Sequence, residues 1–306
     1  MKRAWICLTI LIVLFSLSPS GIEVSNRYGN AGSLFHRNND QLLRIVTYNI
    51  RGCRNDAGFA DPAAVASELA SLQADVITLQ EVDNGLPRSR FQNQVERIAQ
   101  ILGMNYAYGP SLHLLVGTYG NAVLSVFPIQ SADLLPLPSG LESRSVLKVT
   151  LNINGSPFDV YTTHLGLGAA ERGRQSLFLS AYLRKNSGNP AVLAGDFNAS
   201  SHDKIFKDIR TLFHDPLYEQ KLELITLPGK TGKGRGIDHI LLSPRLLFQT
   251  AEAPRIGHSD HYPVLFTTLL APADAKQNEE KTALPNTVPG FIQEKTFTHT
   301  LHESER

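Results

Sequence analysis

Apolar and polar positions follow two different periods along residues 42–270, and the two periods predict different elements. Short runs of β-branched and other apolar residues, bounded by turn-forming residues, are typical of strands. Apolar residues spaced three and four apart are typical of the buried face of a helix. The predicted strands span 42–50, 75–80, 121–126, 145–152, 158–164, 190–194, 237–242 and 264–269. The predicted helices span 62–72, 95–102, 170–185 and 203–212.

Capping and turn residues support these limits and indicate how the strands connect. Asp61 and Pro62 supply an N-cap and a proline at the first helical position, and Gly103 ends the second helix. The turn Asn154-Gly155 joins two of the predicted strands into a hairpin. Helices between the early strands predict parallel crossovers, and hairpins follow later in the chain. The sequence therefore predicts an α/β (α+β) fold with mixed sheets and helices outside them.

The two ends of the chain differ in composition from residues 42–270. Two basic residues precede an almost entirely apolar run at 4–17, which predicts a cleaved signal peptide over 1–20 and an exported protein. An uncleaved membrane anchor is the alternative, although the run is shorter than the roughly 20 residues that span a bilayer. Residues 21–41 are polar and predict a linker, and 271–306 predict a disordered tail because their apolar residues have no period. Residues 42–270 are then one domain.

The overall composition is that of a folded protein, with 42% apolar and 19% charged residues. The formal net charge is +1 at pH 7, which removes the strongest electrostatic argument for a nucleic-acid or membrane partner without excluding one. We expect a monomer, since no feature of the sequence indicates an obligate protein partner.

Several predicted strands end abruptly in polar residues. The strings are Tyr48-Asn49-Ile50, Gln80-Glu81-Val82-Asp83, Thr163-His164-Leu165, Gly195-Asp196-Phe197-Asn198, Ile237-Asp238-His239 and Ser259-Asp260-His261. A buried strand end is a costly place for a carboxylate unless a metal, a cation or a hydrogen bond compensates its charge. Each string alone is common in solvated turns. If the sheets bring them together, the oxygen-rich cluster suits Mg²⁺ or Mn²⁺ better than structural zinc.

As a set and in this order, the strings resemble the motifs of the endonuclease/exonuclease/phosphatase superfamily of metal-dependent phosphohydrolases. The resemblance extends from TYNI at 47–50 to SDHYPVLF at 259–266, which is nearly the whole predicted domain. It implies a four-layer α/β sandwich, in which two mixed β-sheets pack face to face with helices on both outer sides. It also implies a phosphoric-ester hydrolase that uses Mg²⁺, or Mn²⁺ in its place.

The resemblance implies a role for each motif residue. Glu81, helped by Asn49, is implied to bind the metal, and Asp260 is implied to be a metal ligand or a hydrogen-bond partner. The implied catalytic residues are His164, Asp196, Asn198, Asp238 and His261. Asp196 would orient or deprotonate the attacking water, while Asn198 and His164 would donate to the phosphate oxygens. Asp238 would orient His261.

One motif position departs from the family. The family commonly has a glutamate on the strand before the His164 strand, where it supports that histidine, and here Ser143 or Arg144 falls near that place. Glu142 is therefore a candidate partner of His164. His239 is expected to be structural, because the alternation of a strand turns it away from the face that carries Asp238.

Four further residues are candidate substrate contacts: Asn121, Arg144, Lys233 and Arg235. The last two lie in the basic stretch 230–236, for which a solvated turn and a clamp on substrate phosphate are equally supported. Residues 166–172 are expected to begin a helix and not to contact substrate.

The sequence thus predicts an exported, Mg²⁺-dependent phosphodiesterase of nuclease-like character. Two alternatives stay open. One is the same chemistry on a phospholipid, sphingomyelin or an inositol phosphate. The other is a catalytically inactive binding module with the same fold, against which the complete set of motif residues argues.

Overall fold

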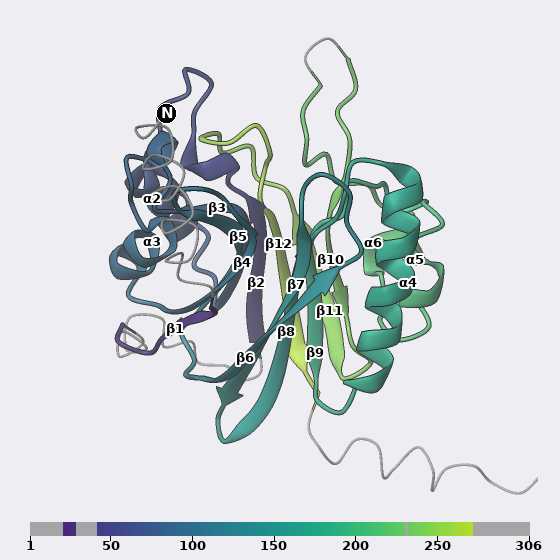
Figure 1. Ribbon diagram of the computed structural model, residues 1–306. Coiled ribbons are helices and arrows are strands. Elements are labelled where there is room, and N and C mark those ends of the chain that lie inside the picture. The colour runs from purple at the N-terminus through teal and green to yellow at the C-terminus, as the bar shows by residue number, and fades with distance from the viewer. Residues whose placement is uncertain (1–20, 29–41, 230–231, 272–306) are drawn as a thin grey trace, which may run out of the picture. The chain divides into compact units, whose positions relative to one another are not determined.

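The structure is a computed structural model that describes residues 21–28, 42–229 and 232–271 (Figure 1). The predicted signal peptide, residues 29–41 of the predicted linker and residues 272–306 of the predicted tail lie outside the described residues. The described residues contain the strands β1 (Glu23–Ser25), β2 (Leu42–Asn49), β3 (Val76–Asn84), β4 (Asn105–His113), β5 (Thr118–Ser125), β6 (Ile129–Leu137), β7 (Arg144–Ile153), β8 (Ser156–His164), β9 (Ala191–Asp196), β10 (Asp238–Leu242), β11 (Leu246–Glu252) and β12 (Val264–Leu270).

The strands form two mixed sheets. The seven-stranded sheet has the order β1-β4-β5-β3-β2-β12-β11, and the five-stranded sheet has the order β10-β9-β8-β7-β6. Each sheet contains one parallel pair, β2 with β3 and β8 with β9, while all other neighbours are antiparallel.

Helices cover both outer faces of the pair of sheets (Figure 1). The helices are α2 (Pro62–Ser71), α3 (Gln94–Leu102), α4 (Ala169–Lys185), α5 (Phe206–Ile209) and α6 (Pro216–Glu219), with 3₁₀ turns η2 (Arg51–Cys53) and η3 (Pro87–Ser89). α2 and α3 pack on the seven-stranded sheet, and α4 and α5 pack on the five-stranded sheet. The predicted four-layer sandwich is confirmed.

Successive side chains of each strand point to opposite faces of its sheet, so one strand contributes to two layers of the core. On β2, Leu43 and Ile45 enter the core between the sheets, whereas Val46 and Tyr48 face α2 and α3. Since side chains alternate between faces, a strand buried on both sides must be apolar almost throughout. Fully burying each such side chain is worth about 1.5–3 kcal/mol relative to leaving it exposed. This core holds the strand ends of the site in fixed relative positions.

The predicted caps and turn are confirmed. The Asp61 side chain accepts hydrogen bonds from the amides of Ala63 and Ala64 at the start of α2. Gly103 ends α3 with a left-handed φ of 65°. Asn154 and Gly155 both have positive φ, as a two-residue hairpin of the type I′ class requires.

Three expectations need correction. Residues 23–25, assigned to a linker, form β1, and the Glu23 carboxylate accepts hydrogen bonds from Tyr106 and Asn93. The helix expected at 203–212 is only α5, four residues long. Strands β4, β6 and β11 were missed because β6 and β11 lie at sheet edges with exposed positions, and β4 contains Gly109-Pro110 next to a register shift. Proline and irregular alternation are tolerated at edges and bulges, where the strand signal is weak.

Candidate active site

The motif residues meet at one end of the sandwich, uppermost in Figure 1. β2 and β3 run parallel in one sheet, and β8 and β9 run parallel in the other, so their carboxyl ends lie together in each pair. β10 runs antiparallel to β9 and begins at this end, with Asp238 opposite Asp196. Strand alternation turns Asn49, His164 and Asp196 toward the space between the sheets. Residues far apart in the chain are thereby brought into contact.

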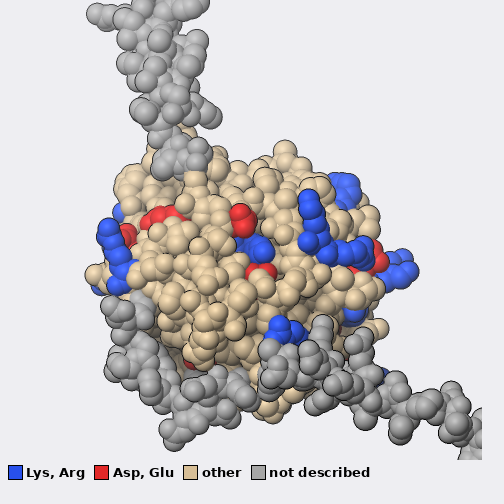
Figure 2. Space-filling view, turned by 90° about the horizontal axis from the view of Figure 1, so that it is seen from below, with Lys and Arg blue, Asp and Glu red and all other residues tan. Residues whose placement is uncertain are grey.

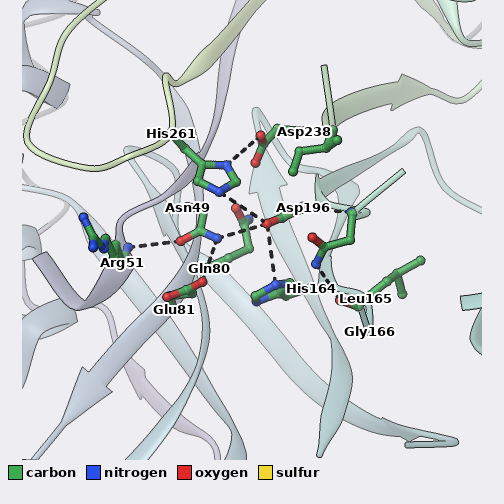
Figure 3. Close-up of polar contacts among 12 residues, drawn as sticks. Asn49, Arg51, Gln80, Glu81, His164, Leu165, Gly166, Asp196, Asp238 and His261 are labelled. Carbon is green, nitrogen blue, oxygen red and sulfur yellow. Dashed lines mark hydrogen bonds and ion pairs between the residues drawn. The ribbon is translucent and has the colours of Figure 1, made fainter. Parts of the chain in front are cut away.

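Asp196 is the centre of the site (Figure 3). Its Oδ2 accepts a hydrogen bond from Asn49 Nδ2 at 3.0 Å, and lies 3.5 Å from His164 Nε2 and 3.8 Å from His261 Nε2. Its Oδ1 accepts a hydrogen bond from the amide of Asn198 at 2.8 Å. The carboxylate thus faces two N–H donors, one on each oxygen, and two imidazole rings.

His261 is held by Asp238. His261 Nδ1 donates to Asp238 Oδ2 at 2.9 Å, and both side chains are buried. The loop that carries His261 is tied to the end of β2, because Ser259 Oγ donates to the carbonyl of Asn49 at 2.7 Å. The amide of Asp238 donates to Thr226 Oγ1 at 3.2 Å. The pair therefore has little freedom to move.

Asp196 and His261 have displaced pKa values. Burial alone would lower the pKa of His261, but the charge and hydrogen bond of Asp238 outweigh it and raise that pKa to about 9. Burial, followed by repulsion from Asp238, raises the pKa of Asp196 to about 7. At neutral pH His261 is therefore an imidazolium, and Asp196 is poised to exchange a proton.

His164 has a different environment. Its Nδ1 lies 3.0 Å from Arg144 Nη1, and burial together with the Arg144 charge holds its pKa well below the usual value. Glu142, expected as a partner of His164, instead accepts a hydrogen bond from Arg144 Nη2 at 3.2 Å. The guanidinium therefore takes the place next to the imidazole that was expected for an acidic residue.

Glu81 reaches the site through a β-bulge. The pairing of β3 with β5 shifts between Leu79 and Val82, and Glu81 has a left-handed φ of 59°. A non-glycine residue in this region costs of order 1 kcal/mol, and such strain persists only where surrounding contacts hold it. Glu81 Oε1 accepts a hydrogen bond from Asn49 Nδ2 at 3.0 Å. The bulge re-aims this carboxylate toward the site.

The donor chemistry fits a divalent cation. Glu81 is only partly buried, and among the described residues its Oε2 has no hydrogen-bond partner. Asn49 lies beside it, but its Oδ1 accepts from the amide of Arg51 at 3.0 Å, so its nitrogen faces Glu81. A second acidic group lies deeper, where ligand atoms of Asp196, Asp238 and His261 are within 4.8 Å of one another. Asp238 Oδ1 is buried there without a hydrogen-bond partner among the described residues.

The remaining predicted residues lie outside this contact network or serve the scaffold. Asp260 is half exposed and its carboxylate is 3.6 Å from Arg51 Nε. Asn121 is buried and donates to the carbonyl of Ser145 at 3.2 Å, which ties the two sheets together. Lys233 and Arg235 are exposed.

Three other expectations concern neighbouring residues. His239 packs against Phe197 and Phe206 with Nε2 2.8 Å from the Ala199 carbonyl, which confirms its structural role. Asn198 uses one amide hydrogen on the carbonyl of Leu165 at 2.9 Å. Residues 166–172 lead into α4, as expected.

Sequence reasoning missed three residues that shape the site. Ser259 ties the His261 loop to β2, and Arg51 pairs with Asp260. Gln80 bridges the sheets beneath the site, since its Nε2 donates to Thr47 and Thr162 at 3.1 Å each. Their position inside or beside the motif strings was the available signal.

The fold and site define a class of protein, and a sequence comparison agrees with it. The profile of the Endonuclease/Exonuclease/phosphatase family matches residues 46–261, so the chain belongs to this family of metal-dependent phosphoric-ester hydrolases. The Escherichia coli K12 protein named "Uncharacterized protein YbhP" is 31% identical over 143 residues. That match covers 42% of this chain and 55% of the relative, or about half of its length.

Solved structures share the fold at low sequence identity. An endonuclease/exonuclease/phosphatase from Beutenbergia cavernae has a TM-score of 0.63 at 21% identity, covering 76% of this chain and 72% of its own. A mannosyl-6-phosphatase from Bacteroides thetaiotaomicron has a TM-score of 0.61 at 17% identity, with 74% and 98% covered. Truncated TDP2 from Caenorhabditis elegans has a TM-score of 0.58 at 20% identity, with 74% and 97% covered.

Proposed function

We propose that the protein is an exported phosphodiesterase that requires Mg²⁺ or Mn²⁺ and cleaves a nuclease-type diester by in-line attack of water. The observation that carries this proposal is the buried constellation around Asp196. A carboxylate with a pKa of about 7 faces one imidazolium and one neutral imidazole, and Asp238 holds the imidazolium in place. Such an arrangement can take a proton from water and stabilise developing negative charge in the same place.

The residues of the chain would divide the work as follows. Asp196 Oδ2 orients the attacking water and accepts its proton. The imidazolium of His261, kept protonated by Asp238, stabilises the charge that builds on the phosphoryl oxygens. His164 Nε2 and the second amide hydrogen of Asn198 donate to the same oxygens. Because these groups are buried at the ends of rigid strands, they need little reorganisation as the charge develops.

The metal would bind through Glu81, with Asn49 beside it. A divalent cation there supplies Lewis-acid polarisation of the phosphoryl group and neutralises its charge. A carboxylate oxygen suits Mg²⁺ and Mn²⁺, and no thiolate is among the candidate ligands.

Charge does not select the substrate strongly. The net charge of +1 fits a low-affinity nuclease and an enzyme of small phosphodiesters equally well. Figure 2 shows the end of the fold opposite the site, where small groups of basic and acidic side chains lie near one another. In the described residues no helix is long and apolar enough to cross a membrane.

A substrate panel tests this proposal. Purified protein would be assayed on plasmid DNA, RNA, sphingomyelin, phosphatidylinositol and bis-p-nitrophenyl phosphate, each with Mg²⁺ and with EDTA. The Asp196→Asn variant controls for a contaminating hydrolase, because it keeps the shape of the side chain and removes its basicity. Metal-dependent cleavage of DNA or RNA that this variant lacks would support the proposal. Cleavage of the lipids alone would replace the nuclease-type substrate, and no Asp196-dependent cleavage of any substrate would contradict it.

A further inference from the structure

The contact between Arg144 and His164 restricts the chemistry of the imidazole. Arg144 Nη1 lies 3.0 Å from His164 Nδ1, and each residue is only 6% exposed. Arg144 is held from the other side by Glu142, and its amide donates to Ser139 Oγ at 2.9 Å. The guanidinium is thus fixed against one ring nitrogen, away from bulk water.

The hydrogen bond with Arg144 determines which nitrogen of the His164 ring carries the proton. A guanidinium has five N–H donors and no acceptor, and it is not deprotonated in proteins. A neutral imidazole has one N–H and one lone pair, and the hydrogen bond made by one nitrogen fixes the state of the other. At 3.0 Å from Arg144, Nδ1 must offer the lone pair, since a proton there would point at another N–H. The single proton of His164 therefore lies on Nε2, which faces Asp196 Oδ2 at 3.5 Å.

An acidic residue in this place would act in the opposite sense. A carboxylate next to Nδ1 would accept a hydrogen bond from Nδ1–H, and would either leave a lone pair on Nε2 or stabilise the imidazolium. That is the arrangement on the other side of Asp196, where Asp238 binds His261. The two histidines of the site are therefore set in different states by neighbours of opposite charge.

We propose that Arg144 is a positioning residue that fixes His164 as a neutral imidazole with its proton on Nε2, so that His164 serves only as a hydrogen-bond donor. The consequence for the reaction rests on the proposed function, with Nε2–H directed at a phosphoryl oxygen. The tautomer itself does not depend on that function. His164 then takes no part in proton transfer, which is left to Asp196 and His261.

Ring ¹⁵N spectra of the metal-free protein test the tautomer directly. A long-range ¹H–¹⁵N correlation spectrum near neutral pH distinguishes the protonated ring nitrogen from the unprotonated one. The signals of His164 are assigned because they are absent from the spectrum of His164→Gln. We expect a protonated Nε2 and an unprotonated Nδ1. Arg144→Lys keeps a donor and should preserve this pattern, whereas Arg144→Glu supplies an acceptor and should move a proton onto Nδ1.

A matched control separates this effect from general disturbance of the site. Arg172 is a partly buried arginine, which donates to the carbonyls of Gly166 and Leu167 just after His164. Arg172→Gln should leave the His164 ring pattern unchanged. A proton on Nδ1 in the unmodified protein would overturn the proposal. An unchanged pattern in a folded Arg144→Glu variant would also overturn it. If that variant does not fold, the position of the proton in the unmodified protein still tests the proposal.

Two isosteric substitutions test the consequence for catalysis. Glutamine places an amide N–H₂ near the position of Nε2, whereas asparagine reaches only the position of Nδ1. If His164 is only a donor through Nε2, His164→Gln should retain at least about tenfold more kcat than His164→Asn, because one such donor is typically worth about 10²–10³ in rate. Equal losses in both variants would contradict a donor-only role. If the unmodified protein cleaves no substrate, the proposed function fails while the spectra still decide the tautomer.

Discussion

Replacing Asp238 with asparagine removes the charge next to His261 and nearly preserves the shape of the side chain. In the native protein Asp238 raises the pKa of His261 to about 9 against the effect of burial. Without that charge, burial should bring this pKa to its ordinary value near 6.5 or below. The change is about 2.5 pKa units, or roughly 3.4 kcal/mol at 1.36 kcal/mol per unit.

The loss of protonation sets a lower limit on the loss of activity. At pH 7.5 a group with a pKa of 9 is almost fully protonated, whereas one with a pKa of 6.5 is only about one-tenth protonated. We therefore expect kcat to fall at least about tenfold from protonation alone. The full loss should be about 10²- to 10⁴-fold, because orientation and charge stabilisation are lost as well.

The effect of Asp238→Asn on the free energy of unfolding follows from the same pKa shift and should be smaller than its effect on activity. The folded-state pKa of His261 lies above its unfolded value, so the pair stabilises the fold fully below about pH 6.5, and this contribution is lost as the pH rises through about 9. Asp238→Asn removes that stabilisation, but it also removes the repulsion that helps to raise the pKa of Asp196. The two changes in unfolding free energy have opposite signs.

The assay combines titration and kinetics. His261 would be titrated by NMR in both proteins, and kcat would be measured on any substrate from the panel that is cleaved. His261→Ala should cost as much as Asp238→Asn or more, and the double variant should cost little beyond the worse single variant, because the two residues act as one unit.

A buried carboxylate far from the site provides the control. Asp159, near the start of β8, binds Thr150 and Lys148 at the other end of the fold. Asp159→Asn should lower stability without changing the pKa of His261 or kcat. An unchanged His261 pKa in Asp238→Asn, effects of the two site variants that multiply, or near-native turnover would refute the reasoning.

Three further predictions concern the metal, the pH dependence and the N-terminus. EDTA should abolish hydrolysis, and Mg²⁺ or Mn²⁺ should restore it. Glu81→Gln should raise the metal concentration needed for half-maximal rate. Full activity in EDTA would contradict the proposed metal requirement. The rate should rise with pH through about 7, where Asp196 becomes a carboxylate, and fall through about 9, where His261 loses its proton. A bound cation should shift the rise in rate to lower pH. A flat profile from pH 6 to 10 would contradict these roles. If the signal peptide is cleaved, N-terminal sequencing of the exported protein should begin near Gly21, and Met1 retained in a membrane fraction would favour the anchor.

Local patterns in the sequence determined most of the elements and the identity of the main site residues. The Asp61-Pro62 start of α2, the Gly103 end of α3 and the Asn154-Gly155 turn are decided by backbone preferences of single residues, so they can be read without a fold. The polar strand ends were visible because a carboxylate that follows a buried run, as Asp196 does, interrupts the apolar pattern. The same alternation placed His239 on the structural face.

Tertiary structure alone decided which of these residues touch and what charge they carry. β1 joins the sheet by pairing with β4, and Asn93 donates to the Glu23 side chain from a distant part of the chain, so neither contact leaves a local period in the sequence. The bulge at Glu81 depends on pairing between β3 and β5. The opposite protonation states of His164 and His261 depend on Arg144 and Asp238, which lie 20 and 23 residues away along the chain. Because a pKa and a tautomer are set by neighbours in space and by burial, sequence could name these histidines but could not assign their states.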